Sequence, residues 1–358
     1  MRIIQLLPTI SYGDAVGNDA VAIRRLLVDF GYDTEIYAQN IDPRLKKGTA
    51  KKLEHLPKLN KKDILLYHLS TGTDLNYQLA DYPGRKVVVY HNITPCEYFY
   101  GYSKTNYDLT YLGREGLSFL KDKVVHCFAD SEYNKTDLQE SGYMCPIDVL
   151  PIIVPFDDYN KTPNPDILAQ YDDDWTNILF VGRVAPNKKQ EDVIKAFAYY
   201  KKYINQKSRL FLVGSYNGME IYHKQLQKYV KSLDVSDVIF TGHTKFDHIL
   251  AYYKLADVFL CMSEHEGFCV PLVEAMYFDV PVIAYKAAAI PDTMGNSGLL
   301  IDEKNPALTA KLIERLTNDK ALKEAVIESQ RCRLKDFSYE STRALFKRYI
   351  GNVVEKRG

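Results

Sequence analysis

The chain has 358 residues with 46 basic and 46 acidic side chains, and 46% of its residues are hydrophobic. This length predicts two domains of ordinary size, and a formal net charge of zero argues against a nucleic-acid-binding protein. The six cysteines form no CxxC pair and no Cys/His metal spacing, which favours a reduced, cytoplasmic compartment. The start, MRIIQLLPTI, is a poor signal peptide, and no stretch has the roughly 20 apolar residues that a membrane span needs.

Strand-like runs alternate with amphipathic helical runs through the first half of the chain, a pattern typical of a parallel sheet covered on both faces. We expect strands at 3–7, 34–38, 64–67, 86–90 and 124–129. Helices are expected at 18–30, 75–81, 109–121 and 134–141. Residues 155–168 are rich in Pro, Asp and Asn, so we interpret them as a linker. The first domain is therefore predicted to span residues 1–160.

A second alternating series follows, with strands expected at 178–181, 209–213, 238–240, 258–261, 282–285 and 298–301. Helices are expected at 191–203, 220–233, 248–256, 272–278 and 306–317, with more helix to the end. The series predicts a second domain at 161–336 and a C-terminal helical segment at 337–358. Two doubly wound, Rossmann-like α/β domains with a cleft between them are the natural arrangement, because ligands of open α/β sheets bind beyond the carboxyl ends of strands.

The stretch 263–285, SEHEGFCVPLVEAMYFDVPVIAY, combines a polar turn, a short helix and a buried strand. Pro271 falls where the helix would begin, since a missing N–H costs nothing there. The two carboxylates Glu266 and Glu274 are eight residues apart, and a helix N-terminus that favours anions lies between them, with the N–H groups of Gly267, Phe268, Cys269 and Val270. The stretch thus offers amides for a phosphate and carboxylates for hydroxyls. Taken singly, Glu266 is more typical of a solvated loop, and Glu274 of a first helical turn, where the dipole favours a glutamate.

Two cations follow the first strand of the second domain, in VGRVAPNK at 181–188. Arg183 comes directly after the carboxyl end of that strand, and Lys188 lies beside the next helix start. A guanidinium and an ammonium suit a diphosphate, the first as a planar fork and the second as a point charge. Alone, the pair is more typical of a solvated surface. The run 172–174, three aspartates, precedes this strand rather than following it, so a solvated turn is favoured over a metal-binding Asp-x-Asp.

Two features of the first domain are candidates for the site. A glycine-containing turn at 11–19 links the first strand and helix, and Gly17 in it lets the backbone approach a phosphate. The turn is not GxGxxG, and Gln39 and Asn40 stand where an acid would hold an NAD ribose, so dinucleotide oxidoreduction is disfavoured. His91 follows the strand at 86–90, at a carboxyl end facing the expected cleft. A lone histidine there is otherwise a structural residue.

Together, these motifs resemble the E-x7-E signature of retaining glycosyltransferases of family 4, which have the GT-B fold. The resemblance covers nearly the whole chain and is strongest at 181–301. It implies that Glu266 approaches the donor sugar, Glu274 binds the ribose, and Arg183 and Lys188 form the G-R-x-x-x-x-K phosphate site. The departures from the family pattern are at Cys269, Phe278 and Asp279, where small residues, often glycine, are commoner.

The resemblance further implies that Gly17 belongs to a loop covering the donor phosphates, that His91 lies by the sugar, and that the last helix packs on the first domain. The expected function is transfer of a hexose, with retention, from a UDP- or GDP-sugar to a hydroxyl acceptor such as a growing cell-surface glycan or lipid-linked saccharide. We expect no metal and no cofactor beyond the donor. The alternatives are a nucleotide-sugar epimerase or hydrolase of the same fold, and a catalytically silent partner subunit.

A basic segment at 43–62, PRLKKGTAKKLEHLPKLNKK, has Arg44 and seven lysines against one acid, Glu54. One interpretation is a solvated basic loop. The other is a surface that rests on anionic lipid, since each basic residue near a membrane contributes about 1 kcal/mol. The second interpretation would place the protein at the inner face of the cytoplasmic membrane, as a peripheral protein.

Overall fold

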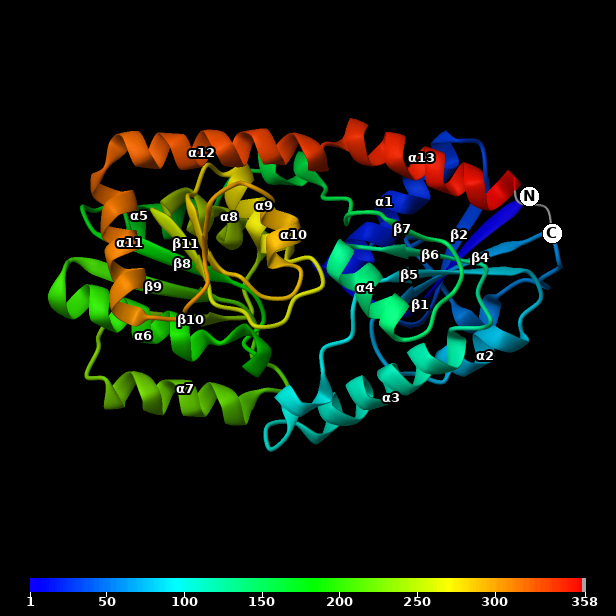
Figure 1. The fold of residues 1–358 in the computed structure, drawn as a ribbon, viewed down its shortest axis with the longest axis horizontal. Helices are drawn as coiled ribbons and strands as arrows, with labels where there is room; N and C mark the ends of the chain where they lie inside the picture. Colours follow the sequence, from blue (N-terminus) through cyan, green and yellow to red (C-terminus); the bar gives the residue numbers. More distant parts are fainter. Residues whose placement is uncertain (356–358) are drawn as a thin grey trace. The chain divides into compact units, whose positions relative to one another are not determined.

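The computed structural model describes residues 1–355, and the chain folds into two compact units (Figure 1). The first unit contains Met1–Cys96, Asn106–Pro155 and the chain from Asp336 onward. The second contains Phe156–Lys335 and one short excursion, Glu97–Thr105. The domains expected from the sequence end at 160 and 336 and do not include this excursion. The predicted C-terminal segment 337–358 ends on residues 356–358, which lie outside the described part of the chain.

The first unit is a seven-stranded parallel sheet in the order β3-β2-β1-β4-β5-β6-β7. Its strands are β1 (Arg2–Ile10), β2 (Asp33–Ile41), β3 (Lys51–Lys52), β4 (Ile64–Leu69), β5 (Arg85–Tyr90), β6 (His126–Ala129) and β7 (Ile147–Val149). Its helices are α1 (Ala15–Asp29), α2 (Leu75–Asp81), α3 (Lys104–Leu120), α4 (Glu132–Glu140) and α13 (Tyr339–Glu355), with short 3-10 turns at η1 (Leu53–His55), η2 (Cys96–Phe99) and η5 (Lys335–Phe337).

Helices cover both faces of this sheet because successive side chains of a strand point to opposite faces. On one face, Ile3 of β1 packs with Ile23 of α1 and with Phe346 of α13. On the other, Leu6 of β1 packs with the side chains of α2, α3 and α4. Figure 1 shows α1 and α13 on the same side of the sheet. The C-terminal helix therefore completes the core of the first unit.

The second unit has a six-stranded parallel sheet in the order β10-β9-β8-β11-β12-β13. Its strands are β8 (Thr176–Val181), β9 (Ser208–Val213), β10 (Val238–Gly242), β11 (Val258–Cys261), β12 (Val282–Tyr285) and β13 (Leu299–Ile301). Its helices are α5 (Pro165–Gln170), α6 (Gln190–Tyr203), α7 (Glu220–Ser232), α8 (Phe246–Leu255), α9 (Val270–Tyr277), α10 (Ile290–Met294), α11 (Pro306–Asn318) and α12 (Lys320–Leu334), with 3-10 turns at η3 (Phe156–Asn160) and η4 (Pro186–Lys188).

In this sheet too, successive side chains of a strand pack against opposite helical layers. Ile178 and Phe180 of β8 face the core layer formed with α6, α7 and α11. Leu179, between them, faces the layer formed with α5, α8, α9 and α10. Both units thus have the doubly wound α/β architecture predicted from the alternating pattern.

All eleven predicted strands and all predicted helices are present, and the structure adds four elements. β3, at the edge of the sheet beside β2, is a pair of exposed lysines, so it carries no hydrophobic signal. The predicted linker at 155–168 is wrong in part: it forms η3, and α5 begins at Pro165 with Asn164 as its N-cap. β7 and α10 are only three and five residues long. In the described part of the chain, no helix combines the length and apolarity that crossing a membrane requires.

Candidate active site

The predicted site residues of the second unit follow two adjacent strands, β8 and β11. The strand order reverses between these two strands, and such a reversal leaves a crevice at the carboxyl ends of an open sheet. Arg183 and Lys188 come from the loop after β8, and Glu266 comes from the loop after β11. Parallel register therefore brings residues about 80 positions apart in sequence to one edge of the sheet.

The loop after β8 approaches neighbouring backbone closely. A Cβ atom on Gly214, which follows β9 with φ of +152°, would lie 2.0 Å from the carbonyl oxygen of Gly182, so only glycine fits. Arg183 is exposed, and its carbonyl oxygen accepts a hydrogen bond of 3.0 Å from Nε2 of Gln190, which is fully buried. The main chain around Arg183 is thereby held in place.

Lys188 and Glu266 form an ion pair between Nζ and Oε2. The side chains are 21% and 8% exposed, so the pair is largely shielded from water. Burial by itself lowers the pKa of Lys188, but the charge of Glu266 raises it above its ordinary value. Lys188 is thus held as a cation at the carboxyl ends of β8 and β11. The structure brings these two predicted site residues together; their roles toward a donor stay predictions.

Further contacts join the same two loops. The N–H of Glu264 donates to the carbonyl oxygen of Asn187 at 2.9 Å, and Asn187 Nδ2 donates to the carbonyl oxygen of His265 at 3.0 Å. Lys189, beside Lys188, lies 3.3 Å from Glu264. Two lysine–glutamate pairs and two hydrogen bonds to main chain therefore fix one loop against the other.

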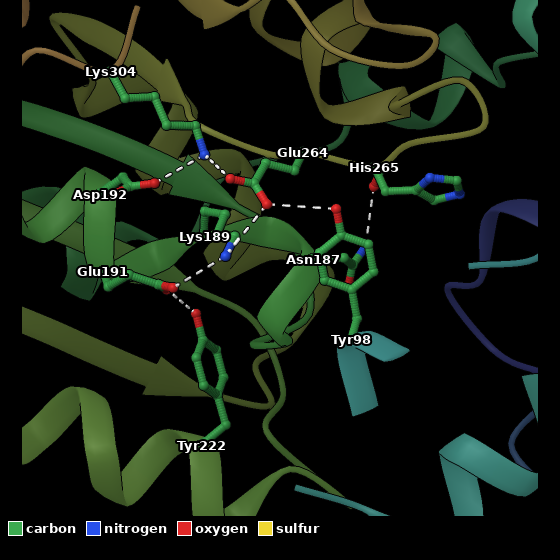
Figure 2. Close-up of polar contacts among 9 residues, drawn as sticks. All are labelled: Tyr98, Asn187, Lys189, Glu191, Asp192, Tyr222, Glu264, His265 and Lys304. Carbon is green, nitrogen blue, oxygen red and sulfur yellow. Dashed lines mark hydrogen bonds and ion pairs between the residues drawn. The ribbon is translucent and has the colours of Figure 1, made fainter. Parts of the chain in front are cut away.

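Glu264 is the centre of the polar network in Figure 2. One carboxylate oxygen accepts from Lys304 Nζ at 2.8 Å, and this lysine also lies 2.8 Å from Asp192. The other oxygen accepts from the hydroxyl of Tyr98 at 3.4 Å. Tyr98 belongs to the excursion Glu97–Thr105, so this network anchors the excursion to the second unit. From the sequence, Tyr98 could equally be a residue that stacks on a sugar acceptor or a core residue, and its contact with Glu264 could not be predicted because the two are 166 residues apart.

Helix α9 begins at Val270, with Pro271 in its first turn as predicted. Cys269 is its N-cap and has φ of +72°, and Asp279, two residues past the helix, has φ of +56°. These are two of the three departures from the family pattern, and both have the left-handed backbone that glycine adopts without steric cost. The family preference for small residues at these positions is therefore a backbone requirement, which Cys269 and Asp279 meet with some strain.

Glu274 lies on α9 and accepts two tyrosine hydrogen bonds. Tyr159 donates to Oε1 at 2.9 Å, and Tyr253 donates to Oε2 at 2.7 Å. Burial raises the pKa of Glu274, and the two hydroxyls lower it by less, so the pKa is raised overall. The tyrosines orient the carboxylate but leave each oxygen a second lone pair for a ligand hydroxyl. Neither tyrosine had a sequence signal that distinguished it among the 28 tyrosines.

In the first unit, Gly17 lies in the first turn of α1, and its N–H donates to the N-cap Asp14 at 3.1 Å. A Cβ on Gly17 would lie 3.1 Å from the carbonyl oxygen of Ser11, so the glycine permits close packing of helix and loop.

His91 follows β5, and its side chain is only 1% exposed. Nδ1 lies 2.9 Å from Asp130 and Nε2 lies 2.9 Å from His68. Both ring nitrogens therefore have protein partners.

Two groups of described residues bring metal-type ligand atoms within 4.8 Å of one another, namely Cys261 with Glu266 and Cys269, and Asp19 with His68 and His91. In each group, protein partners already occupy ligand atoms, so we assign no metal to either. The aspartates at 172–174 lie before β8, where Asp173 pairs with Arg209 and Asp174 lies 2.7 Å from Lys207. These pairs agree with the interpretation of the run as a turn.

Comparison with known proteins supports the motif analysis. Residues 164–333 match the family "Glycosyl transferases group 1". A D-inositol 3-phosphate glycosyltransferase of Corynebacterium kroppenstedtii is 26% identical over 185 residues, or 50% of this chain and 40% of that protein. The GalNAc-alpha-(1->4)-GalNAc-alpha-(1->3)-diNAcBac-PP-undecaprenol alpha-1,4-N-acetyl-D-galactosaminyltransferase of Campylobacter jejuni is 27% identical over 179 residues, or 49% and 48%. The chain spans about half the length of these curated relatives.

Among solved structures, Anabaena HepE in complex with UDP and glucose has a TM-score of 0.70 at 18% identity, covering 98% of this chain and 100% of that one. At this identity the likeness shows the fold alone. The family match lies within the second unit and contains Lys188, Glu266 and Glu274. Residues 164–333, just under half of the chain, thus match the glycosyl transferases group 1, and the fold of the chain is GT-B.

Proposed function

We propose that the protein is a retaining glycosyltransferase that moves a hexose from a nucleotide diphosphate sugar to a hydroxyl acceptor. The observation that carries this proposal is the Lys188–Glu266 pair at the reversal of strand order, inside the region that matches the family. A shielded cation beside a carboxylate suits a donor with a diphosphate and a polyhydroxylated sugar. The partly buried carboxylate of Glu274, oriented by two tyrosines, suits the ribose hydroxyls.

The chemical task is to break the bond between the anomeric carbon and a diphosphate oxygen. Negative charge then builds on the leaving group, and Lys188 and Arg183 stabilise it most strongly in the transition state. The amides at 267–270 would add donors at the start of α9. Glu266, held by Lys188, orients the sugar. In the absence of an evident nucleophile, the acceptor attacks from the face that the phosphate leaves, which retains the anomeric configuration.

Release of nucleoside diphosphate tests the proposal directly. The protein is incubated with a panel of UDP- and GDP-sugars, with and without saccharide acceptors, and the diphosphate and the glycosylated product are measured. Acceptor-dependent release supports a transferase. Diphosphate released without any acceptor supports a hydrolase, an altered nucleotide sugar without cleavage supports an epimerase, and no turnover of any donor supports a silent partner subunit.

The donor and acceptor classes follow from the relatives' names. HepE was solved with UDP and glucose, and the Campylobacter jejuni relative is named for an undecaprenol-linked saccharide. We propose a UDP- or GDP-hexose as donor and a growing glycan or lipid-linked saccharide as acceptor. The reaction needs no metal in this scheme, because cationic side chains and amides neutralise the leaving group. Activity should therefore survive EDTA; loss that Mn²⁺ or Mg²⁺ reverses would contradict this part.

Contact with an anionic membrane is a separate part of the proposal and concerns the basic segment 43–62. Its leucines Leu45, Leu53, Leu56 and Leu59 pack against the core of the first unit, while all seven lysines are exposed. The attraction would thus be electrostatic, without insertion of apolar side chains. The proposed setting is the inner face of the cytoplasmic membrane.

Vesicle sedimentation in low and high salt tests this part. Substituting Lys46, Lys47, Lys51 and Lys52 with glutamine should abolish binding to anionic vesicles while donor turnover is kept. A control variant replaces four exposed lysines of the second unit, Lys195, Lys224, Lys228 and Lys231. Equal binding to neutral and anionic vesicles, or none to either, would leave the solvated-loop interpretation.

A further inference from the structure

A buried chain of hydrogen bonds crosses the sheet of the first unit. Nε2 of His68 lies 2.9 Å from Oε1 of Gln5, Nδ1 of His68 lies 2.9 Å from Nε2 of His91, and Nδ1 of His91 lies 2.9 Å from Oδ2 of Asp130. The two imidazole planes differ by 6° and their centroids are 5.2 Å apart, so the rings meet edge to edge. The adjacent strands β1, β4, β5 and β6 bring the four residues together.

Both ends of this chain are hydrogen-bond acceptors. At one end, Nε2 of Gln5 lies 3.1 Å from the carbonyl oxygen of Ala20, which can only accept. The amide of Gln5 must therefore turn its NH2 group to Ala20 and its oxygen to His68. At the other end, the carboxylate of Asp130 accepts from His91. Gln5 and His68 are fully buried and Asp130 is 2% exposed, so water does not substitute for these partners.

The count of protons follows from these fixed ends. Three contacts lie between the two ends, and each contact needs one proton, so with Asp130 ionised the two rings must supply three protons. Two neutral imidazoles carry only two. Without the third proton, two lone pairs would face each other across 2.9 Å in a buried site, or an imidazole lone pair would face a carbonyl or carboxylate oxygen.

We propose that His91 holds the third proton, so that it is doubly protonated, and that Gln5, His68 and Asp130 are positioning residues for it. The charge belongs on His91 rather than His68 because His91 alone contacts Asp130. Asp19 is the other acidic group nearby; it is 2% exposed, it accepts from the N–H of Ile153 at 2.9 Å, and burial raises its pKa to about 7.

Burial raises the pKa of Asp130, so this carboxyl is the competing site for the third proton, whereas the charge of His91 lowers the pKa of Asp130. Burial lowers the pKa of His91, but the charges of Asp130, Asp19 and Asp14 raise it above the ordinary value. Burial and the charge of His91 both lower the pKa of His68. A doubly protonated ring cannot accept a proton. If the proposed function holds, His91 thus acts as a fixed positive charge, not as a general base.

Nuclear magnetic resonance of the apo protein with ¹⁵N-labelled histidine tests the charge state, with His91→Asn used to assign the signals. At pH 7, both ring nitrogens of His91 should carry protons and His68 should be neutral and protonated on Nε2. Asp130→Asn keeps the shape but removes the counter-charge, so His91 should become neutral. Gln5→Leu removes the acceptor at the other end and should have the same effect, which covers the case that Asp130→Asn does not fold.

His68→Gln should leave His91 doubly protonated, because an amide oxygen accepts from His91 and an NH2 group donates to Gln5. His55→Gln, at an exposed position, is the control. A neutral His91 in the wild-type protein, an unchanged charge in both Asp130→Asn and Gln5→Leu, or ring signals altered by a chelator would each overturn the proposal. These outcomes do not depend on donor turnover. A failure of this proposal can therefore be distinguished from a failure of the proposed function.

Discussion

The polar groups of the two units are built differently. In the second unit, three successive residues of one loop, Asn187, Lys188 and Lys189, contact a loop that follows the neighbouring strand, and the contacts are partly open to solvent. In the first unit, four residues from four different strands or strand ends form a closed, buried chain, namely Gln5, His68, His91 and Asp130. The loops of the second unit therefore keep hydrogen-bonding groups that a ligand can use. In the buried chain of the first unit, the ring nitrogens are already bonded to protein partners.

Lys188 illustrates this capacity. An ammonium group has three N–H donors, and within residues 1–355 its ion-pair partner is Glu266. Two donors remain for phosphate oxygens. His91, in contrast, uses both nitrogens on protein partners, so a sugar hydroxyl would have to displace His68 to reach its ring. This difference predicts that variants in the loops of the second unit change catalysis most.

Lys188→Ala should have the largest effect. Loss of one donor to transition-state charge lowers kcat by about 10²–10³, and a charged hydrogen bond contributes roughly 1.5–3 kcal/mol. The matched control is Lys189→Ala, one residue away, which pairs with Glu264 and Glu191 and should reduce kcat by less than about tenfold. Steady-state kinetics with the donor identified by the panel measures both.

Removal of Lys188 also leaves Glu266 without its cation, so folding is checked by circular dichroism and thermal unfolding. Lys188→Arg keeps the charge and should recover part of the activity. Equal losses in Lys188→Ala and Lys189→Ala would mean that the network of Figure 2 matters as a whole and that Lys188 has no special role.

Much of this site was predictable because its residues lie in short motifs. Pro271 and Glu274 mark the start of a helix, and Arg183 and Lys188 follow a strongly hydrophobic strand, so local pattern and strand position were enough to group them. The element boundaries followed from the same patterns, and α2, β11 and β12 have the predicted bounds.

The partners of these residues were not predictable from one sequence. Tyr159 and Tyr253 are 115 and 21 residues from Glu274, and Lys304 is 40 residues from Glu264. Single polar residues inside apolar strands, such as His68 in β4, carry no signal of their own. Their pairing depends on strand order, which the pattern of alternation does not specify. His91 was found by its position, whereas the chain that holds it required the folded sheet.

Substitutions of the two signature glutamates, Glu266 and Glu274, should have different effects on kcat and KM. Glu274→Gln should raise donor KM by roughly tenfold with a smaller change in kcat, because ribose contacts are similar in the ground and transition states. Glu266→Gln should act more on kcat, because this residue orients the transferred sugar and fixes Lys188. The reverse pattern in purified, folded variants would mean that the assigned roles are exchanged.

The smallest expected effect concerns the pH dependence of stability. It tests the environment of Glu274 without a measurement of catalysis. The pKa of Glu274 is raised in the folded protein because burial disfavours its charge. The native state therefore binds this proton more tightly than the unfolded chain, where glutamate titrates near pH 4.3. The contribution of Glu274 to stability is fully present below that value and is lost as pH rises through the folded pKa. Glu274→Gln removes this loss, so the stability of the variant relative to wild type should increase with pH. Chemical unfolding between pH 4 and 8 measures the difference.

Glu220→Gln is the control of opposite sign, because the N–H of Gly218 lowers the pKa of that exposed carboxyl, and its contribution is lost as pH falls. A parallel pair of stability curves for wild type and Glu274→Gln would show that the tyrosine hydroxyls fully offset the burial of Glu274, and that this carboxylate is ready for a ribose without any cost to the fold.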